Sequence, residues 1–138
     1  MDPLVLAAAT ALVTAMATDG WQQARSGAVA LWRRVHPERV TAIEAELGEV
    51  RTELLAAREA SDAPAEEGLV ADWQRKLRRL LAEDPQLAGE LRRVLDEQWT
   101  PLLGAAERTT VDVIVQSASA TGHGQVYQAG RDQNIYKR

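Results

Sequence analysis

The run from Pro3 to Thr18, PLVLAAATALVTAMAT, contains no charged residue, and this feature constrains the fold more than any other stretch of the chain. Asp2 and Pro3 form a helix start, because an N-cap residue is followed by proline at the first helical position. Apolar residues then occur on every side of the helical wheel. A helix that is apolar all round is either the central element of a protein core or a membrane segment.

Three interpretations of this run are open. A secretory signal peptide is disfavoured, because it begins with basic residues and the only charge before the run is Asp2. A permanent transmembrane helix is too short, because 16 residues span about 24 Å of a hydrocarbon core of about 30 Å. A buried core helix fits the run, and so does a helix that is buried at rest and enters a bilayer after a conformational change. The residues that would face lipid in the second case are Leu4, Val5, Leu6, Leu12, Val13 and Met16.

The middle of the chain predicts further helices that pack against this one. Apolar residues mark one face from Trp21 to Val35, and they repeat at alternating spacings of three and four from Val40 to Ala57. That seam suits antiparallel packing within a bundle. Two more apolar faces follow, at 69–81 and 87–95. Asp19-Gly20 either breaks or bends the chain after the uncharged run, and Trp99, Leu102 and Leu103 are expected to close the floor of the bundle. The sequence therefore predicts an all-α fold, with a four- to five-helix bundle over residues 1–103, and a flexible, amyloid-prone tail.

A basic cluster lies on the outer face of the helix predicted around 69–81. One interpretation is a solvated face whose cations pair with nearby glutamates. The other is a contact surface for anionic lipid headgroups. Nucleic acid is an unsuitable main partner, because residues 37–97 carry nine Lys or Arg against fifteen Asp or Glu. The residues of the cluster are Arg75, Lys76, Arg78 and Arg79.

The residue types needed for catalysis or metal binding are scarce. The chain has no cysteine, and its two histidines, His36 and His123, have no second ligand at metal-binding spacing. No phosphate loop, nucleophile elbow or dinucleotide fingerprint occurs. We therefore expect no enzyme activity, no catalytic or metal-binding residues, and no cofactor.

The character of the chain changes after Thr109. The β-branched run 111–116 predicts extended structure, and residues 104–121 are interpreted as a linker. Two similar triplets follow within 122–138, Gln125-Val126-Tyr127 and Asn134-Ile135-Tyr136. Their amides form ladders when identical strands stack in register, and their aliphatic and tyrosine side chains supply dry contacts. Because one isolated hairpin is marginal in water, its natural partners are other copies of itself. The alternative is a disordered or loosely docked C-terminal segment.

The segment Tyr127-Gln128-Ala129-Gly130, followed by Asn134-Ile135-Tyr136, resembles the RIP homotypic interaction motif of necroptosis proteins. It is still more similar to the bacterial amyloid signalling motifs. There the motif ends a small helical domain, called the Bell domain, which is similar to the fungal HeLo-type cell-death domains. The layout of an apolar first helix, a bundle and a C-terminal motif resembles Bell-domain proteins over the whole chain.

The resemblance implies roles for the motif residues. Gln128 and Asn134 would form amide ladders, Gly130 the turn, and Val126, Ile135 and Tyr136 the packing positions. Ala129 and Tyr127 stand where the motif usually has branched aliphatic residues. The whole motif comprises Gln125, Val126, Tyr127, Gln128, Ala129, Gly130, Asn134, Ile135 and Tyr136.

The resemblance also implies a function in regulated cell death. The motif would be templated by an NLR-like receptor with a matching motif and would assemble into homo-oligomeric fibrils. The protein would be cytoplasmic at rest and would act at the cell membrane when activated, where the helix from Pro3 to Thr18 permeabilises the bilayer. The alternative is a non-lytic adaptor, in which the bundle binds another protein and the tail clusters it.

Overall fold

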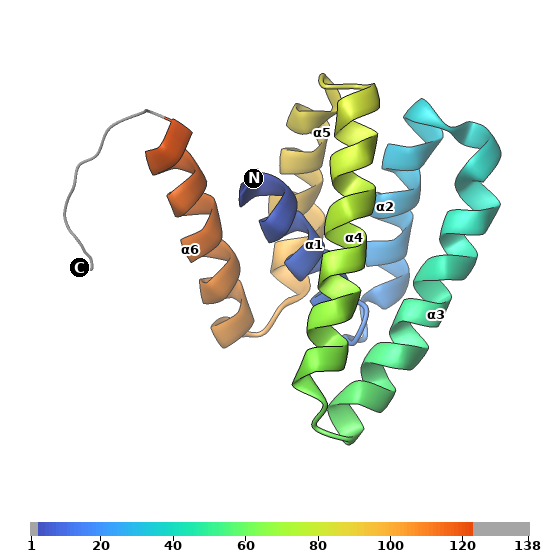
Figure 1. Ribbon diagram of the computed structural model, residues 1–138, viewed down its shortest axis with the longest axis vertical. Helices are drawn as coiled ribbons and strands as arrows, with labels where there is room; N and C mark the ends of the chain where they lie inside the picture. Colours follow the sequence, from blue (N-terminus) through green and yellow to red (C-terminus); the bar gives the residue numbers. More distant parts are fainter. Residues whose placement is uncertain (1–2, 123–138) are drawn as a thin grey trace.

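The computed structural model describes residues 3–122, and the side chains of 3–115 among them. This part of the chain is all-helical and contains no strand (Figure 1). The predicted all-α class is therefore confirmed. The elements are α1 (Pro3–Ala15), α2 (Trp21–Val35), η1 (Pro37–Arg39), α3 (Val40–Glu59), α4 (Ala63–Glu83), α5 (Leu87–Val94), η2 (Leu95–Trp99), η3 (Thr100–Leu102) and α6 (Ala105–Gly122).

Helix α1 is the centre of the bundle. It contacts every other α-helix, and its contacts with α4 and α6 are the most extensive. Figure 1 shows α4 on one side of α1 and α6 on the other. All the alanines of α1 are inaccessible to solvent, and so are Val5, Leu12 and Val13, as expected for a helix that is apolar all round.

The end of α1 comes earlier than the end of the uncharged run. The helix stops at Ala15, and the Thr18 hydroxyl donates a hydrogen bond to the Ala15 carbonyl oxygen at 2.7 Å. The Gly20 N–H donates in turn to Thr18 Oγ1 at 3.2 Å. Thr18 thus belongs to the turn, and the break predicted at Asp19-Gly20 separates α1 from α2.

Helices α3 and α4 form an antiparallel hairpin. The Asp62 side chain caps α4 by accepting a hydrogen bond from the Ala65 N–H at 3.1 Å. Ser61, in the turn, has a φ of 56°, a conformation that favours glycine. The apolar seam predicted for α3 is confirmed, because each of its later members is buried: Ile43, Leu47, Val50, Leu54 and Ala57.

Trp99 joins the end of η2 to α2. Its side chain is fully buried, and its indole N–H donates to the carbonyl oxygen of Ala24 at 3.1 Å. Gly27 makes this close approach possible, because a Cβ there would lie 3.1 Å from the Trp99 indole nitrogen. The predicted floor of the bundle is present, with Leu103 also buried and Leu102 packed against the core.

The linker and extended structure predicted after residue 103 are wrong for most of that stretch. Residues 105–122 form α6, which adds a sixth α-helix to the four or five expected. Val111 is buried, so tertiary packing outweighs the weak preference of β-branched residues for strands. Glu107 also stabilises the helix start, because its Oε1 accepts a hydrogen bond from the Gly104 N–H at 3.1 Å. The predicted amyloid-prone tail comprises residues 122–138; Gly122 ends α6, and 123–138 lie outside the described residues.

Candidate functional site: a buried apolar helix and a basic pocket

The residues expected to face lipid lie in the core of the bundle or at its edge. Val5, Leu12, Val13 and Met16 are at most 1% exposed. Leu4 and Leu6 are half-buried. A core position at rest agrees with both interpretations of the uncharged run, the permanent core helix and the helix released later. The nine predicted motif residues all lie beyond Gly122, outside the part of the chain that the structure describes.

Helix α6 covers α1 and leads directly into the motif segment. Val111, at 1% exposure, is its most deeply buried side chain among residues 105–115. Ile114 and Val115 also pack against the core. Val113, two residues from Val111, points to solvent and is 55% exposed. On this side, α1 is thus covered by one amphipathic helix, α6, which directly precedes the predicted motif in the sequence.

Arg51 of α3 holds the C-terminal end of α1. Its Nη1 donates to the carbonyl oxygens of Met16 at 2.6 Å and of Thr18 at 3.3 Å. The guanidinium also lies 4.9 Å from the centre of the Trp21 ring. A cation at a helix C-terminus is favourable because the last carbonyls carry partial negative charge. The sequence pattern gave no signal for this contact, because Arg51 lies on the predicted outer face of its helix.

The predicted basic cluster is divided by its ion pairs. Arg75 pairs with Asp72, and the Lys76 amine lies 3.1 Å from Glu46 and 5.6 Å from the Trp73 ring centre. Arg78 and Arg79 are exposed and make no ion pair within the described residues. The interpretation as a solvated, paired face therefore fits Arg75 and Lys76, while Arg78 and Arg79 keep their charge available.

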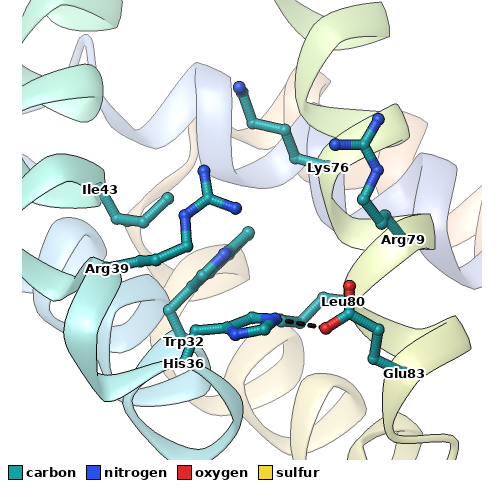
Figure 2. Close-up of a pocket in the computed structure, with 8 residues that line it drawn as sticks. All are labelled: Trp32, His36, Arg39, Ile43, Lys76, Arg79, Leu80 and Glu83. Atoms are coloured by element: carbon teal, nitrogen blue, oxygen red, sulfur yellow. Dashed lines mark hydrogen bonds and ion pairs between the residues drawn. The ribbon is translucent and has the colours of Figure 1, made fainter.

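Arg79 belongs to a pocket where α2, η1, α3 and α4 meet (Figure 2). Trp32, Ile43 and Leu80 contribute its apolar part, and Arg39, Lys76 and Arg79 supply three cations. Arg39, which the sequence analysis did not single out, is exposed and has no ion pair within residues 3–115. The pocket encloses only about 40 Å³, little more than the volume of one water molecule. It can therefore bind an anionic group at its mouth, but it cannot enclose a larger molecule.

His36 and Glu83 close the other side of this pocket, and the dashed line in Figure 2 marks their ion pair. The hydrogen bond to Glu83 raises the pKa of His36 above its usual 6.5, against a smaller lowering by burial, and Glu38 at 3.1 Å adds to the rise. The histidine thus favours its charged form. This adds a fourth positive group beside Arg39, Lys76 and Arg79, partly balanced by the Glu83 carboxylate.

Metal-binding and membrane-spanning features were also sought in residues 3–122. Among these residues, no three His, Asp or Glu side chains are placed to hold a metal ion. None of the helices found there is both long and apolar enough to cross a bilayer. Comparison with known proteins gives no family, since no family model, no curated protein and no solved structure matches the chain.

Proposed function

We propose that this protein is a prion-like effector of regulated cell death. Its motif at 122–138 assembles by templated amyloid formation, and its helical bundle then permeabilises the membrane through α1. The observation that carries this proposal is the order of the elements. The uncharged helix α1 is covered by α6, and α6 ends at Gly122, where the motif segment begins in the sequence.

Simple geometry couples assembly of the motif to release of α6. Strands in a cross-β stack repeat every 4.7–4.8 Å or so. An α-helix with its side chains is about 10 Å wide. The helix is therefore about twice as wide as the spacing between neighbouring chains in the stack. If the motifs stack, the α6 helices that directly precede them cannot all remain packed on α1. Some must detach or unfold, and detachment uncovers the apolar surface around Val111.

Release of α6 would make α1 available to a bilayer. The helix has 13 residues and a length of about 20 Å, so one copy is shorter than the hydrocarbon core of about 30 Å. Permeabilisation would therefore need several copies inserted together. Clustering through the motif supplies such a group of copies at one place on the membrane.

The basic pocket supplies a first contact with an anionic membrane. Arg39 and Arg79 have no ion pair within the described residues, and they flank the same pocket. Each Lys or Arg close to an anionic surface contributes about 1 kcal/mol to binding. Phosphate oxygens of a headgroup would accept hydrogen bonds from both guanidinium groups.

A non-lytic adaptor is the second candidate function. The observation that favours it is the burial of most of α1, whose release would expose many apolar side chains to water. In this case the tail would cluster the protein while the bundle stays folded and binds a protein partner.

Seeding experiments separate these functions. A synthetic peptide of residues 110–138 should form fibrils that bind thioflavin and show a repeat of about 4.7 Å. Such fibrils should seed the full chain and cause dye release from anionic vesicles. A peptide that stays monomeric at high concentration contradicts templated assembly. Seeded assembly with intact vesicles and unaffected growth of expressing cells indicates the adaptor. An NLR-like receptor with a matching motif is the partner that we propose for natural seeding.

A further inference from the structure

A groove runs along the side of α1 that faces α4. Leu6, Thr10 and Thr14 line it from α1, and Val70, Ala71 and Gln74 line it from α4. Its volume of about 540 Å³ lies within the range of ligand-binding sites in proteins, about 300–1,000 Å³. The basic pocket lies at the contact of α4 with α2 and α3, so the two sites are separate.

Gln74 indicates that the groove is built to receive a polar partner. Its side chain is only 8% exposed, and its Nε2 has no hydrogen-bond acceptor among the described residues. A buried amide left unpaired costs roughly 1–3 kcal/mol. Nε2 is itself shielded from solvent, whereas Gln74 lines the groove, so a rotation of the amide group would turn Nε2 to the groove, where an acceptor oxygen of a ligand would satisfy it.

The chemistry of the groove suits an extended peptide. Leu6 and Val70 provide apolar surface, Gln74 provides a donor for a peptide carbonyl, and Glu66 and Glu67 stand at the far end. Glu67 is exposed and makes no ion pair within the described residues, so it can take a basic side chain. The same carboxylates would repel the negative charge of a fatty acid or an anionic lipid, so these ligands suit the groove less well. From residue 63 to 74 the groove is about 16 Å long, which matches about five residues of extended chain.

We propose that residues 123–138 of this chain bind the groove in extended form. They follow α6, whose end and the start of α1 lie toward the same end of the bundle in Figure 1. Leu6, close to the start of α1, lines that end of the groove. Fully extended, they reach about 50 Å, well beyond the groove length. In the expected register, the segment around Val126–Gly130 covers Val70 and Gln74. Arg131 then reaches Glu67, and Lys137 and Arg138 give the segment a net positive charge that complements Glu67, whereas Glu66 is already paired with Arg58 at 3.0 Å.

Docking would hold Tyr127 and Gln128 away from other copies. A backbone that pairs with Gln74 cannot at the same time pair with strands above and below it. This consequence for assembly rests on the proposed function, whereas the docking itself does not. The groove would then act as the resting-state site of the segment.

The absence of cysteine from the chain allows a direct test by disulfide cross-linking. The full chain would carry Ala129→Cys together with Ala71→Cys in the groove. The matched control combines Ala129→Cys with Ala65→Cys, an exposed alanine about a third of a turn away around α4 and nearer its start. Because a disulfide requires Cα atoms within about 7 Å, docking should make the intramolecular bond form at least about tenfold faster in the groove pair.

Each outcome of the cross-linking has a defined meaning. Equal rates for the groove pair and the control overturn the proposal. Disulfide-linked dimers through position 71 show that the groove takes the segment of a second copy, which overturns docking within one chain. Val70→Lys and Glu67→Lys, each added to the groove pair, should slow the reaction several-fold. If both variants keep their helicity, measured by circular dichroism, and form the disulfide at an unchanged rate, the docking proposal is also overturned.

The cross-linked protein separates docking from assembly. The oxidised groove pair should resist seeding by fibrils of the 110–138 peptide, and reduction should restore seeding. If the oxidised protein is seeded as fast as the reduced one, docking does not restrain assembly. If neither form is seeded, the wild-type chain is not seeded either, and the groove disulfide forms rapidly, then docking stands and the proposed function fails.

Discussion

Helix α6 offers a matched pair of substitutions that tests whether it restrains α1. Val111 is 1% exposed and Val113 is 55% exposed, although both belong to the same helix and the same residue type. Changing either to Asp alters helix propensity equally. Any difference between Val111→Asp and Val113→Asp therefore reports the contact of α6 with the core.

The magnitude follows from burial. Full burial of a valine side chain contributes about 1.5 kcal/mol or more, and Val111→Asp removes this contribution. An unpaired carboxylate placed in the same site costs more still, so the docking free energy of α6 falls by at least about 2 kcal/mol. Since 1.4 kcal/mol corresponds to a factor of ten, the undocked population should rise about 30-fold or more.

Hydrogen exchange followed by mass spectrometry measures this change in α1 and α6. Exchange of both helices should accelerate by about 30-fold in Val111→Asp and remain near the wild-type rate in Val113→Asp. Dye release from anionic vesicles should rise in the first variant without seeding. Equal exchange of α1 in the two variants would refute the idea that α6 restrains α1, and unfolding of α2–α5 in Val111→Asp would show a general loss of the core.

Three further predictions concern the turn, the pocket and its histidine. Ser61→Gly should raise the free energy of unfolding by about 0.5–1 kcal/mol, because glycine adopts a φ of 56° without strain. Urea unfolding measures this free energy. A lower free energy of unfolding in Ser61→Gly would contradict the idea that Ser61 is strained. His36 has a raised pKa, so its ion pair with Glu83 stabilises the fold fully below about pH 6.5 and this contribution is lost as the pH rises through the raised value. Urea midpoints above pH 6 should therefore fall with pH in the wild type and fall less in His36→Gln, and parallel curves would contradict this. Arg39→Ala should weaken binding to anionic vesicles, measured by sedimentation, by about fivefold. Arg92→Ala removes a cation that is already paired with Asp96 at 3.0 Å, so it should change this binding little. Equal losses of binding in the two variants would show that only the net charge of the protein matters.

Periodicity in the sequence was sufficient to predict the helices up to residue 95. The seam from Ile43 to Ala57 is buried as expected, because a spacing of three and four places these side chains on one face. The break at Asp19-Gly20 and the buried Trp99 were also predicted. Local pattern is informative here because each helix has a clear apolar stripe.

Helix α6 was missed because its local preferences and its tertiary environment disagree. Val111, Val113 and Val115 alternate like a strand, yet burial against α1 places Val111 in a helix. The pair Gly104 and Glu107, at the spacing of a capping box, was the signal that could have indicated a helix start.

The basic pocket could be predicted only in part. Lys76 and Arg79 were identified because they are close in sequence, whereas Arg39 and His36 reach the same place from η1 and the end of α2. His36 and Glu83 are 47 positions apart, so no local pattern links them. The pairing of Arg75 with Asp72 likewise depends on side-chain geometry that residue types alone do not determine.

The most direct test of the proposed function is dye release by the seeded full chain with a charge placed on α1. Thr10→Lys is suitable, because Thr10 is half-buried at the groove and the change leaves the core side chains in place. A lysine at mid-membrane costs about 2.5–3.5 kcal/mol. We expect fibrils of the 110–138 peptide to convert both proteins fully, and Thr10→Lys at least as fast as the wild type, because a lysine in the groove also weakens docking of residues 123–138. Only the wild type should then empty anionic vesicles. Equal dye release from the two proteins, or none from either after full assembly, would contradict membrane attack by α1.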